Sequence, residues 1–259
     1  MHAVHTVPAF SDNYIWLQEN SDGTAQVVDP GDASVVNDAL EARGLRLTAI
    51  LLTHHHFDHV GGVEELKGRH GCRVYGPDNP GISAIDEILR EGDEVSIGDF
   101  RFEVLEVPGH TLDHIAYFQS ATDDTPPLLF CGDTLFAGGC GRIFEGDPPM
   151  MFSSLAKLME LPSDTVVYCA HEYTLANLAF AMAADGENTA LQERVADAKS
   201  LRERDIPTVP STIALELATN PFLRAAEDGP KAGLTAAGRD AGSDDVSTFA
   251  ALRAWKDEF

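Results

Sequence analysis

The stretch that decides the fold is Leu51-Leu52-Thr53-His54-His55-His56-Phe57-Asp58-His59. The apolar run Leu47–Leu52 predicts a buried strand, and a dense group of imidazoles with one carboxylate begins where that strand ends. Neutral imidazole and carboxylate suit zinc, iron and manganese as ligands. A surface histidine tract would not be interrupted by Phe57-Asp58 directly after a strand, so the pattern predicts a metal site.

The spacing within this stretch predicts two groups of ligands. Residues two apart in extended backbone face the same side, so His54 and His56 are expected to bind one metal ion while His55 points elsewhere. Asp58 and His59 follow as the chain turns toward a helix, and they can face a second ion.

Three further candidate ligands occupy the same kind of position. His110, Asp133 and His171 each come directly after a predicted strand. Sites in α/β proteins form outside the ends of strands, so we expect all three to join the histidine cluster.

The first two thirds of the chain alternate short β-branched or aromatic runs with helical patterns, which predicts an α/β fold. Gly98-Asp99 predicts a hairpin turn. The expected helices are Ala33–Arg43, Gly62–His70 and Pro149–Leu161. The expected strands are Tyr14–Leu17, Ala25–Val28, Leu47–Leu52, Cys72–Tyr75, Phe102–Val107, Ile115–Phe118, Leu128–Cys131 and Thr165–Cys169.

The pattern changes after His171, where helical spacing replaces strand signals. This change predicts a catalytic domain over residues 1–172 and a smaller helical domain over residues 173–259. Within the second domain, the Gly-, Ala- and Asp-rich stretch Ala225–Asp245 is interpreted as a mobile loop, and Ser247–Asp257 as a closing helix.

The net charge of −24 argues against two classes of binding partner. A chain this acidic repels nucleic-acid phosphates and anionic membrane surfaces. We therefore expect no nucleic-acid partner and no membrane partner. The acidity fits either a salt-rich environment that screens self-repulsion or simply an acidic, soluble protein. Nothing in the sequence demands an oligomer, so a monomer is expected.

The cysteines and the N-terminus point to the cytoplasm. No signal peptide and no apolar run long enough to span a bilayer is recognisable. The four cysteines, none in a CxxC pair, are expected to be reduced and mostly buried.

The order HxHxDH, then Gly-His, Gly-Asp and a final His resembles the signature of the metallo-β-lactamase superfamily. This resemblance implies an αβ/βα sandwich and two divalent metal ions, expected to be zinc, with iron and manganese as alternatives. It places His54, His56 and His110 on one ion, Asp58, His59 and His171 on the other, and Asp133 between them as a shared ligand.

Longer motifs resemble glyoxalase II, the hydroxyacylglutathione hydrolases. Asp113 departs from that family, which commonly has Gly at this position. The matching motifs are residues 7–17 (VPAFSDNYIWL), 28–31 (VDPG), 134–142 (TLFAGGCGR), 171–174 (HEYT), 220–224 (NPFLR) and 253–257 (RAWKD).

The resemblance implies hydrolysis of S-(2-hydroxyacyl)glutathione thioesters, typically S-lactoylglutathione to lactate and glutathione, as in methylglyoxal detoxification. It also implies that Arg142, Tyr173, Arg253 and Lys256 bind the glutathione moiety. Asp29 is either the acceptor that orients a ligating imidazole or a simple turn carboxylate.

The chemistry of such a site needs no protein nucleophile. Water shared by two metal ions supplies hydroxide near neutral pH, the ions stabilise the oxyanion, and a thiolate leaves readily. Cys140 and Cys169 are therefore expected to be packing residues.

Three alternatives remain open. A mononuclear iron dioxygenase acting on glutathione persulfide would not need the ligands of the second ion. Lactonases, phosphodiesterases and β-lactamases of the same superfamily would not be expected to have the C-terminal segment that carries Arg253 and Lys256. A metal-storage protein would surround its ions with protein ligands and show no metal-dependent turnover.

Overall fold

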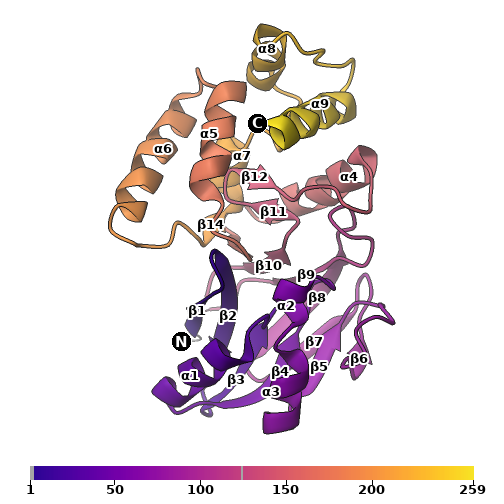
Figure 1. Ribbon diagram of the computed structural model, residues 1–259, viewed down its shortest axis with the longest axis vertical. Helices are drawn as coiled ribbons and strands as arrows, with labels where there is room; N and C mark the ends of the chain where they lie inside the picture. The colour runs from indigo at the N-terminus through magenta and orange to yellow at the C-terminus, as the bar shows by residue number, and fades with distance from the viewer. Residues whose placement is uncertain (1–2, 124) are drawn as a thin grey trace. The chain divides into compact units, whose positions relative to one another are not determined.

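The computed structural model describes residues 3–123 and 125–259 (Figure 1). The chain divides into two compact units. The first unit is Met1–Val107 with Asp113–Gly132, and the second is Pro108–Leu112 with Asp133–Phe259.

One sheet of the first unit begins as antiparallel strands and continues as parallel ones. The strand order follows the sequence, antiparallel from β1 to β3 and parallel from β3 to β6. The parallel part places the end of β4 in the sheet interior, directly before the histidine cluster. The strands are β1 (Ala3–Ala9), β2 (Asn13–Glu19), β3 (Thr24–Val28), β4 (Arg46–Leu51), β5 (Arg73–Gly76) and β6 (Glu87–Ile88).

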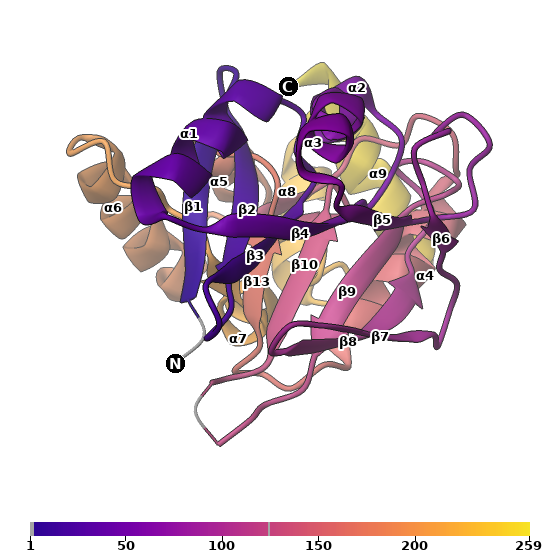
Figure 2. The same ribbon diagram turned by 90° about the horizontal axis from the view of Figure 1, so that it is seen from below.

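Helices α1 (Ala33–Arg43) and α3 (Val63–His70) lie on the same face of this sheet (Figure 2). The Asp32 side chain caps α1 by accepting a hydrogen bond from the Ser34 N–H. Apolar side chains of both helices pack against alternate residues of the strands, and their burial supplies the main hydrophobic stabilisation of this face. The short helix α2 (Phe57–Val60) carries Asp58 and His59.

Four antiparallel strands complete the first unit, beginning with a hairpin at Gly98-Asp99. Gly98 adopts a φ of +57°, which glycine takes without strain. The Tyr117 hydroxyl donates a 2.7 Å hydrogen bond to the carbonyl of Leu52, so this sheet supports the chain beside the histidine cluster. The strands are β7 (Glu94–Ile97), β8 (Phe100–Glu106), β9 (Ile115–Gln119) and β10 (Leu128–Gly132).

The second unit is mainly helical. Strands β11 and β12 form a small hairpin, and β13 pairs antiparallel with β14. Its elements are β11 (Leu135–Phe136), β12 (Gly139–Cys140), α4 (Pro148–Met159), β13 (Val166–Cys169), α5 (Thr174–Ala184), α6 (Thr189–Arg202), β14 (Ser211–Thr212), α7 (Ile213–Thr219), α8 (Asp228–Ala236) and α9 (Asp245–Glu258).

A buried carboxylate connects several segments of the second unit. Glu216 on α7 is fully buried and ion-paired with Arg194 on α6. Its Oε2 accepts hydrogen bonds from the Gly138 N–H at 2.9 Å and from Asn220 Nδ2 at 3.0 Å. The glycine-rich turn between β11 and β12 is therefore fixed by a charge on a helix far away in sequence.

The helices and strands expected from the sequence are present, with ends shifted by a few residues, but one expectation is wrong. Ala225–Asp245 is not simply a mobile loop, because it contains α8, which buries Pro230 and Leu234. A Cβ at Gly233 would lie 1.9 Å from the Ala184 carbonyl oxygen. The small residues that favour a loop in the sequence instead allow α8 to pack closely against the end of α5.

No helix among the described residues is long and apolar enough to cross a membrane.

Candidate active site

The loop after β4 is held by hydrogen bonds on both sides of Thr53. The Thr53 carbonyl accepts from the Ile115 N–H at 2.9 Å. The Thr53 N–H donates to Asp29 Oδ1 at 2.7 Å, and its hydroxyl donates to Asp29 Oδ2 at 2.7 Å. Asp29 is buried and has a φ of +53°, so its carboxylate turns back toward this loop. These hydrogen bonds fix the backbone that carries the histidine cluster.

The same contacts assign the tautomers of two histidines. The single proton of the Thr53 hydroxyl is given to Asp29, so Thr53 Oγ1 accepts from His54 Nδ1 at 3.1 Å. His59 Nδ1 lies 3.0 Å from Asp29 Oδ2, a carboxylate oxygen that accepts the hydrogen bond. Both rings therefore carry their proton on Nδ1 and present the lone pair of Nε2.

The presented donor atoms of the first unit form two pairs. His54 Nε2 lies 3.1 Å from His56 Nδ1. His59 Nε2 lies 3.5 Å from Asp58 Oδ2, and the same oxygen accepts a 2.9 Å hydrogen bond from Asn13 Nδ2. These are the two groups expected from the spacing of the motif.

The second unit holds two further imidazoles around one carboxylate. Asp133 Oδ2 lies 3.4 Å from His110 Nε2, and Asp133 Oδ1 lies 3.3 Å from His171 Nε2. His110 Nδ1 donates to the Arg142 carbonyl at 2.7 Å, which leaves Nε2 as the presented atom. All three side chains are buried. One carboxylate thus offers a separate oxygen beside each of two imidazoles.

These spacings fit metal coordination. Two ligand atoms that each lie about 2.1 Å from a tetrahedral ion are separated by about 3.4 Å. Within each unit the donor pairs are 3.1 to 3.5 Å apart. The donors are nitrogen and carboxylate oxygen, so the set suits zinc, iron or manganese.

Two glycines that were not among the expected site residues bring the backbone close to ligand residues. A Cβ at Gly31 would lie 1.9 Å from the Asp58 carbonyl oxygen, and a Cβ at Gly141 would lie 2.0 Å from the Asp133 carbonyl oxygen. Both belong to motifs quoted above, but a glycine in a motif does not reveal which backbone it approaches.

Three cations and one carboxylate gather at the end of α9. Asp257 Oδ1 accepts hydrogen bonds from Arg142 Nε at 3.2 Å and Arg253 Nη2 at 2.9 Å. Burial, with the neighbouring Arg253 and Arg142, lowers the pKa of Lys256. The structure therefore brings the expected residues Arg142, Arg253 and Lys256 together and adds Asp257 to them.

Tyr173 lies elsewhere in the second unit. Its ring stacks on the ring of His171, with centroids 4.6 Å apart and an interplanar angle of 5°. Tyr173 is partly exposed, so it can offer a surface to a ligand beside that imidazole.

The cysteines have the properties of packing residues. All four are free and buried. Burial raises the pKa of the Cys169 thiol to about 12 and raises that of Cys140 as well. Neither forms the thiolate that a nucleophile requires at neutral pH.

His55, whose ring centroid lies 5.2 Å from that of His56, contacts Asp113. His55 Nδ1 lies 2.9 Å from Asp113 Oδ1, and Asn79 Nδ2 donates to Asp113 Oδ2 at 2.8 Å. The aspartate that replaces a glycine of the resembled family thus connects two loops of the first unit.

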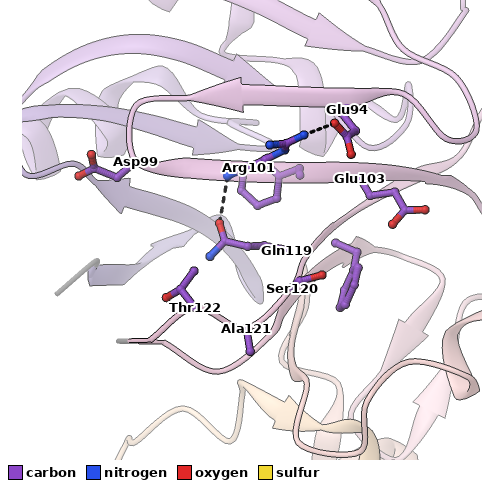
Figure 3. A pocket seen from close by; sticks show the side chains of 10 residues that line it. Glu94, Asp99, Arg101, Glu103, Gln119, Ser120, Ala121 and Thr122 are labelled. Atoms are coloured by element: carbon purple, nitrogen blue, oxygen red, sulfur yellow. Dashed lines mark hydrogen bonds and ion pairs between the residues drawn. The ribbon is translucent and has the colours of Figure 1, made fainter.

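A cavity of about 310 Å³ lies beside the β7–β8 hairpin (Figure 3). Arg101 forms an ion pair there with Glu94, and its backbone N–H donates to Gln119 Oε1. None of the residues that line this cavity is an expected site residue.

Comparisons with known proteins agree with the order of these motifs. Residues 8–171 match the model of the metallo-beta-lactamase superfamily, and residues 172–259 match that of the hydroxyacylglutathione hydrolase C-terminus. A hydroxyacylglutathione hydrolase of Pseudomonas paraeruginosa is 53% identical, with 100% of both chains covered.

Solved structures share the fold at lower identity. ETHE1 from Myxococcus xanthus is 25% identical, with a TM-score of 0.66 and 98% of each chain covered. TTHA1623, solved in a di-iron-bound form, is 28% identical, with a TM-score of 0.59 and coverage of 85% of this chain and 100% of the other. The expected metallo-β-lactamase fold, followed by a helical C-terminal region, is confirmed.

Proposed function

This chain belongs to the hydroxyacylglutathione hydrolases of the metallo-β-lactamase superfamily, and we propose that S-lactoylglutathione is its substrate, cleaved to lactate and glutathione at a dinuclear metal site. Membership in this family makes the chain a thioester hydrolase. A role in methylglyoxal detoxification is part of the proposal.

We propose that His54, His56 and His110 hold one ion and that Asp58, His59 and His171 hold the other, with Asp133 shared. The observation that carries a dinuclear rather than a mononuclear site is the placement of the two Asp133 oxygens beside different imidazoles. Zinc is proposed in both positions. The di-iron form of TTHA1623 is the reason to test iron as well, and manganese suits the same ligands.

When bound, two divalent ions lower the pKa of water toward neutrality and stabilise negative charge on a carbonyl oxygen. The residues of the chain keep the donor atoms ready for them. Asp29 and Thr53 fix the tautomers of His54 and His59, so the imidazoles need no reorientation. A thiolate leaves without a strong acid, so no cysteine is required as acid or nucleophile.

Glutathione thioesters carry two carboxylates, and a chain of net charge −24 repels them at long range. Local cations must therefore bind them. We propose that Arg142, Arg253 and Lys256 bind the glutathione carboxylates and that Tyr173 contacts the same moiety. The support is the gathering of these cations at the end of α9.

Residues 1–172 are proposed as the catalytic domain and residues 173–259 as the glutathione-binding domain. We also propose a monomer in the cytoplasm, without nucleic-acid or membrane partners. The free, buried cysteines and the acidic composition support this proposal.

The experiment is hydrolysis of S-lactoylglutathione, followed at the thioester absorbance before and after chelation and metal replacement. His171→Ala is the test variant, and His5→Gln is the matched control, because His5 contacts only Glu19 among the contacts described for it. The proposal predicts that chelation and His171→Ala abolish turnover and that His5→Gln does not. Turnover that survives chelation would contradict it, and oxidation of glutathione persulfide with iron alone would favour the dioxygenase instead.

A further inference from the structure

We infer that Asp257 is a positioning residue for the substrate, because its carboxylate holds the exposed guanidinium of Arg142 against the buried guanidinium of Arg253. The inference rests on the proposed function, in which these cations bind the glutathione moiety. Asp257 itself would not contact the substrate.

The contacts form a continuous series that starts in the interior of the second unit. Arg253 is buried, lies over the Phe222 ring with its guanidinium carbon 5.0 Å from the centroid, and donates from Nη1 to the Cys140 carbonyl at 3.0 Å. Its Nη2 donates to Asp257 Oδ1 at 2.9 Å. Arg253 therefore fixes the position of the Asp257 carboxylate.

The same oxygen then fixes Arg142. Arg142 Nε donates to Asp257 Oδ1 at 3.2 Å, and Nη2 contacts the Asp257 backbone carbonyl at 3.4 Å. The Arg142 side chain is 55% exposed, so without this acceptor it would sample many rotamers. An arginine held in one orientation loses less entropy when it binds a carboxylate, and preorganisation of this kind improves affinity.

Charge gives a second reason for a carboxylate at this position. Lys256 lies close enough to Arg253 and Arg142 that both lower its pKa, whereas Asp257 raises it. Three cations and one carboxylate have a net charge of about +2, which still attracts an anionic tripeptide. Asp257 therefore reduces the repulsion among the cations without cancelling their attraction for the substrate.

The Arg142–Asp257 pair is half exposed, and an exposed ion pair adds little to folding stability. Asp257 also pairs with the buried Arg253, so the free energy of unfolding is measured by urea denaturation beside KM. Asn keeps an acceptor oxygen for Arg253, and the change in substrate affinity is expected to exceed the change in stability. Asp257→Asn should raise the KM for S-lactoylglutathione roughly 5-fold, with kcat changed less than about 2-fold. Asp257→Glu keeps the carboxylate and should restore most of the affinity.

The matched control is Glu258→Gln, which removes the same charge from the next residue, whose described ion pair is with Arg239. KM should then stay within about 2-fold of wild type. In an Arg142→Ala background, Asp257→Asn should add little further increase in KM, since the residue that it positions is gone.

The proposal is overturned if Asp257→Asn lowers KM, if Glu258→Gln raises it equally, or if the effect of Asp257→Asn is undiminished in Arg142→Ala. A thioester of a small neutral thiol provides the second substrate, for which Asp257→Asn should leave KM unchanged. Failure of the proposed function has a different result: the wild-type enzyme would hydrolyse the neutral thioester but not S-lactoylglutathione.

Discussion

Replacement of Asp29 by Asn tests whether this carboxylate prepares the metal ligands. The aspartate accepts three hydrogen bonds, two from Thr53 and one from His59. Asn tolerates the positive φ of this position and is the same size, so the backbone should not move. Its Oδ1 can still accept from the Thr53 N–H, but its amide NH₂ would face two donors.

The two donors that would face the amide NH₂ determine the expected loss of stability and of metal affinity. A buried hydrogen bond to a charged group contributes about 1.5–3 kcal/mol, so apo-protein stability should fall by roughly 3 kcal/mol. His59 loses the acceptor that keeps its proton on Nδ1, and loss of such an acceptor weakens metal affinity about 10- to 100-fold. His54 depends on the same carboxylate through the Thr53 hydroxyl, so both metal ions should be released at a lower chelator concentration than in the wild type.

The assay is competition for metal with a chromophoric chelator, together with urea unfolding of the apo-protein. Asp32→Asn is the control, because it removes the same charge from a helix N-cap three residues away, where Asn caps equally well. The reasoning is refuted if Asp29→Asn and Asp32→Asn bind both metal ions equally tightly.

Three further substitutions test other parts of the structure. Glu216→Leu leaves the charge of Arg194 buried and unpaired and should destabilise the protein by about 3–5 kcal/mol, measured by urea unfolding; a loss below about 1 kcal/mol would contradict the role given to this pair. Gly141→Ala places a methyl group against the Asp133 carbonyl oxygen and should lower the metal content roughly 10-fold, measured by elemental analysis. Full metal occupancy in this variant would contradict the prediction, because it would show that the loop moves to accommodate the methyl group. In the folded protein the pKa of Lys256 lies below its ordinary value of 10.5, so Lys256 loses its positive charge at a lower pH than an ordinary lysine does. KM should then rise with pH already below 10.5, and Lys256→Arg should remove that rise; an unchanged pH profile would contradict the binding role.

Most of the fold could be predicted because its signals are local. The α1 helix has the predicted bounds Ala33–Arg43, since an N-capping aspartate precedes it and a glycine ends it. The hairpin at Gly98-Asp99 follows from turn chemistry in the same way. In contrast, the Gly- and Ala-rich composition of α8 concealed a helix, because its small residues serve packing against α5 rather than flexibility.

In the candidate site, too, the features with a local sequence signal could be predicted and those that depend on distant partners could not. The pairing of His54 with His56, and of Asp58 with His59, follows from backbone periodicity and a helix start. Asp257 and Glu216 were missed, because each acts through partners more than 70 residues away, such as Arg142 and Gly138. Asp257 stands beside Lys256 in a motif that resembles the family, but proximity in sequence does not reveal that its carboxylate connects Arg142 to the buried Arg253.

The most direct test of the central claim measures metal content and turnover together. The apo-protein is titrated with zinc while S-lactoylglutathione hydrolysis is followed, and bound metal is counted at each point. We predict that hydrolysis is restored by metal and reaches its maximum at two ions per chain. Full activity at one ion per chain, or activity independent of metal, would contradict the dinuclear site built on Asp133.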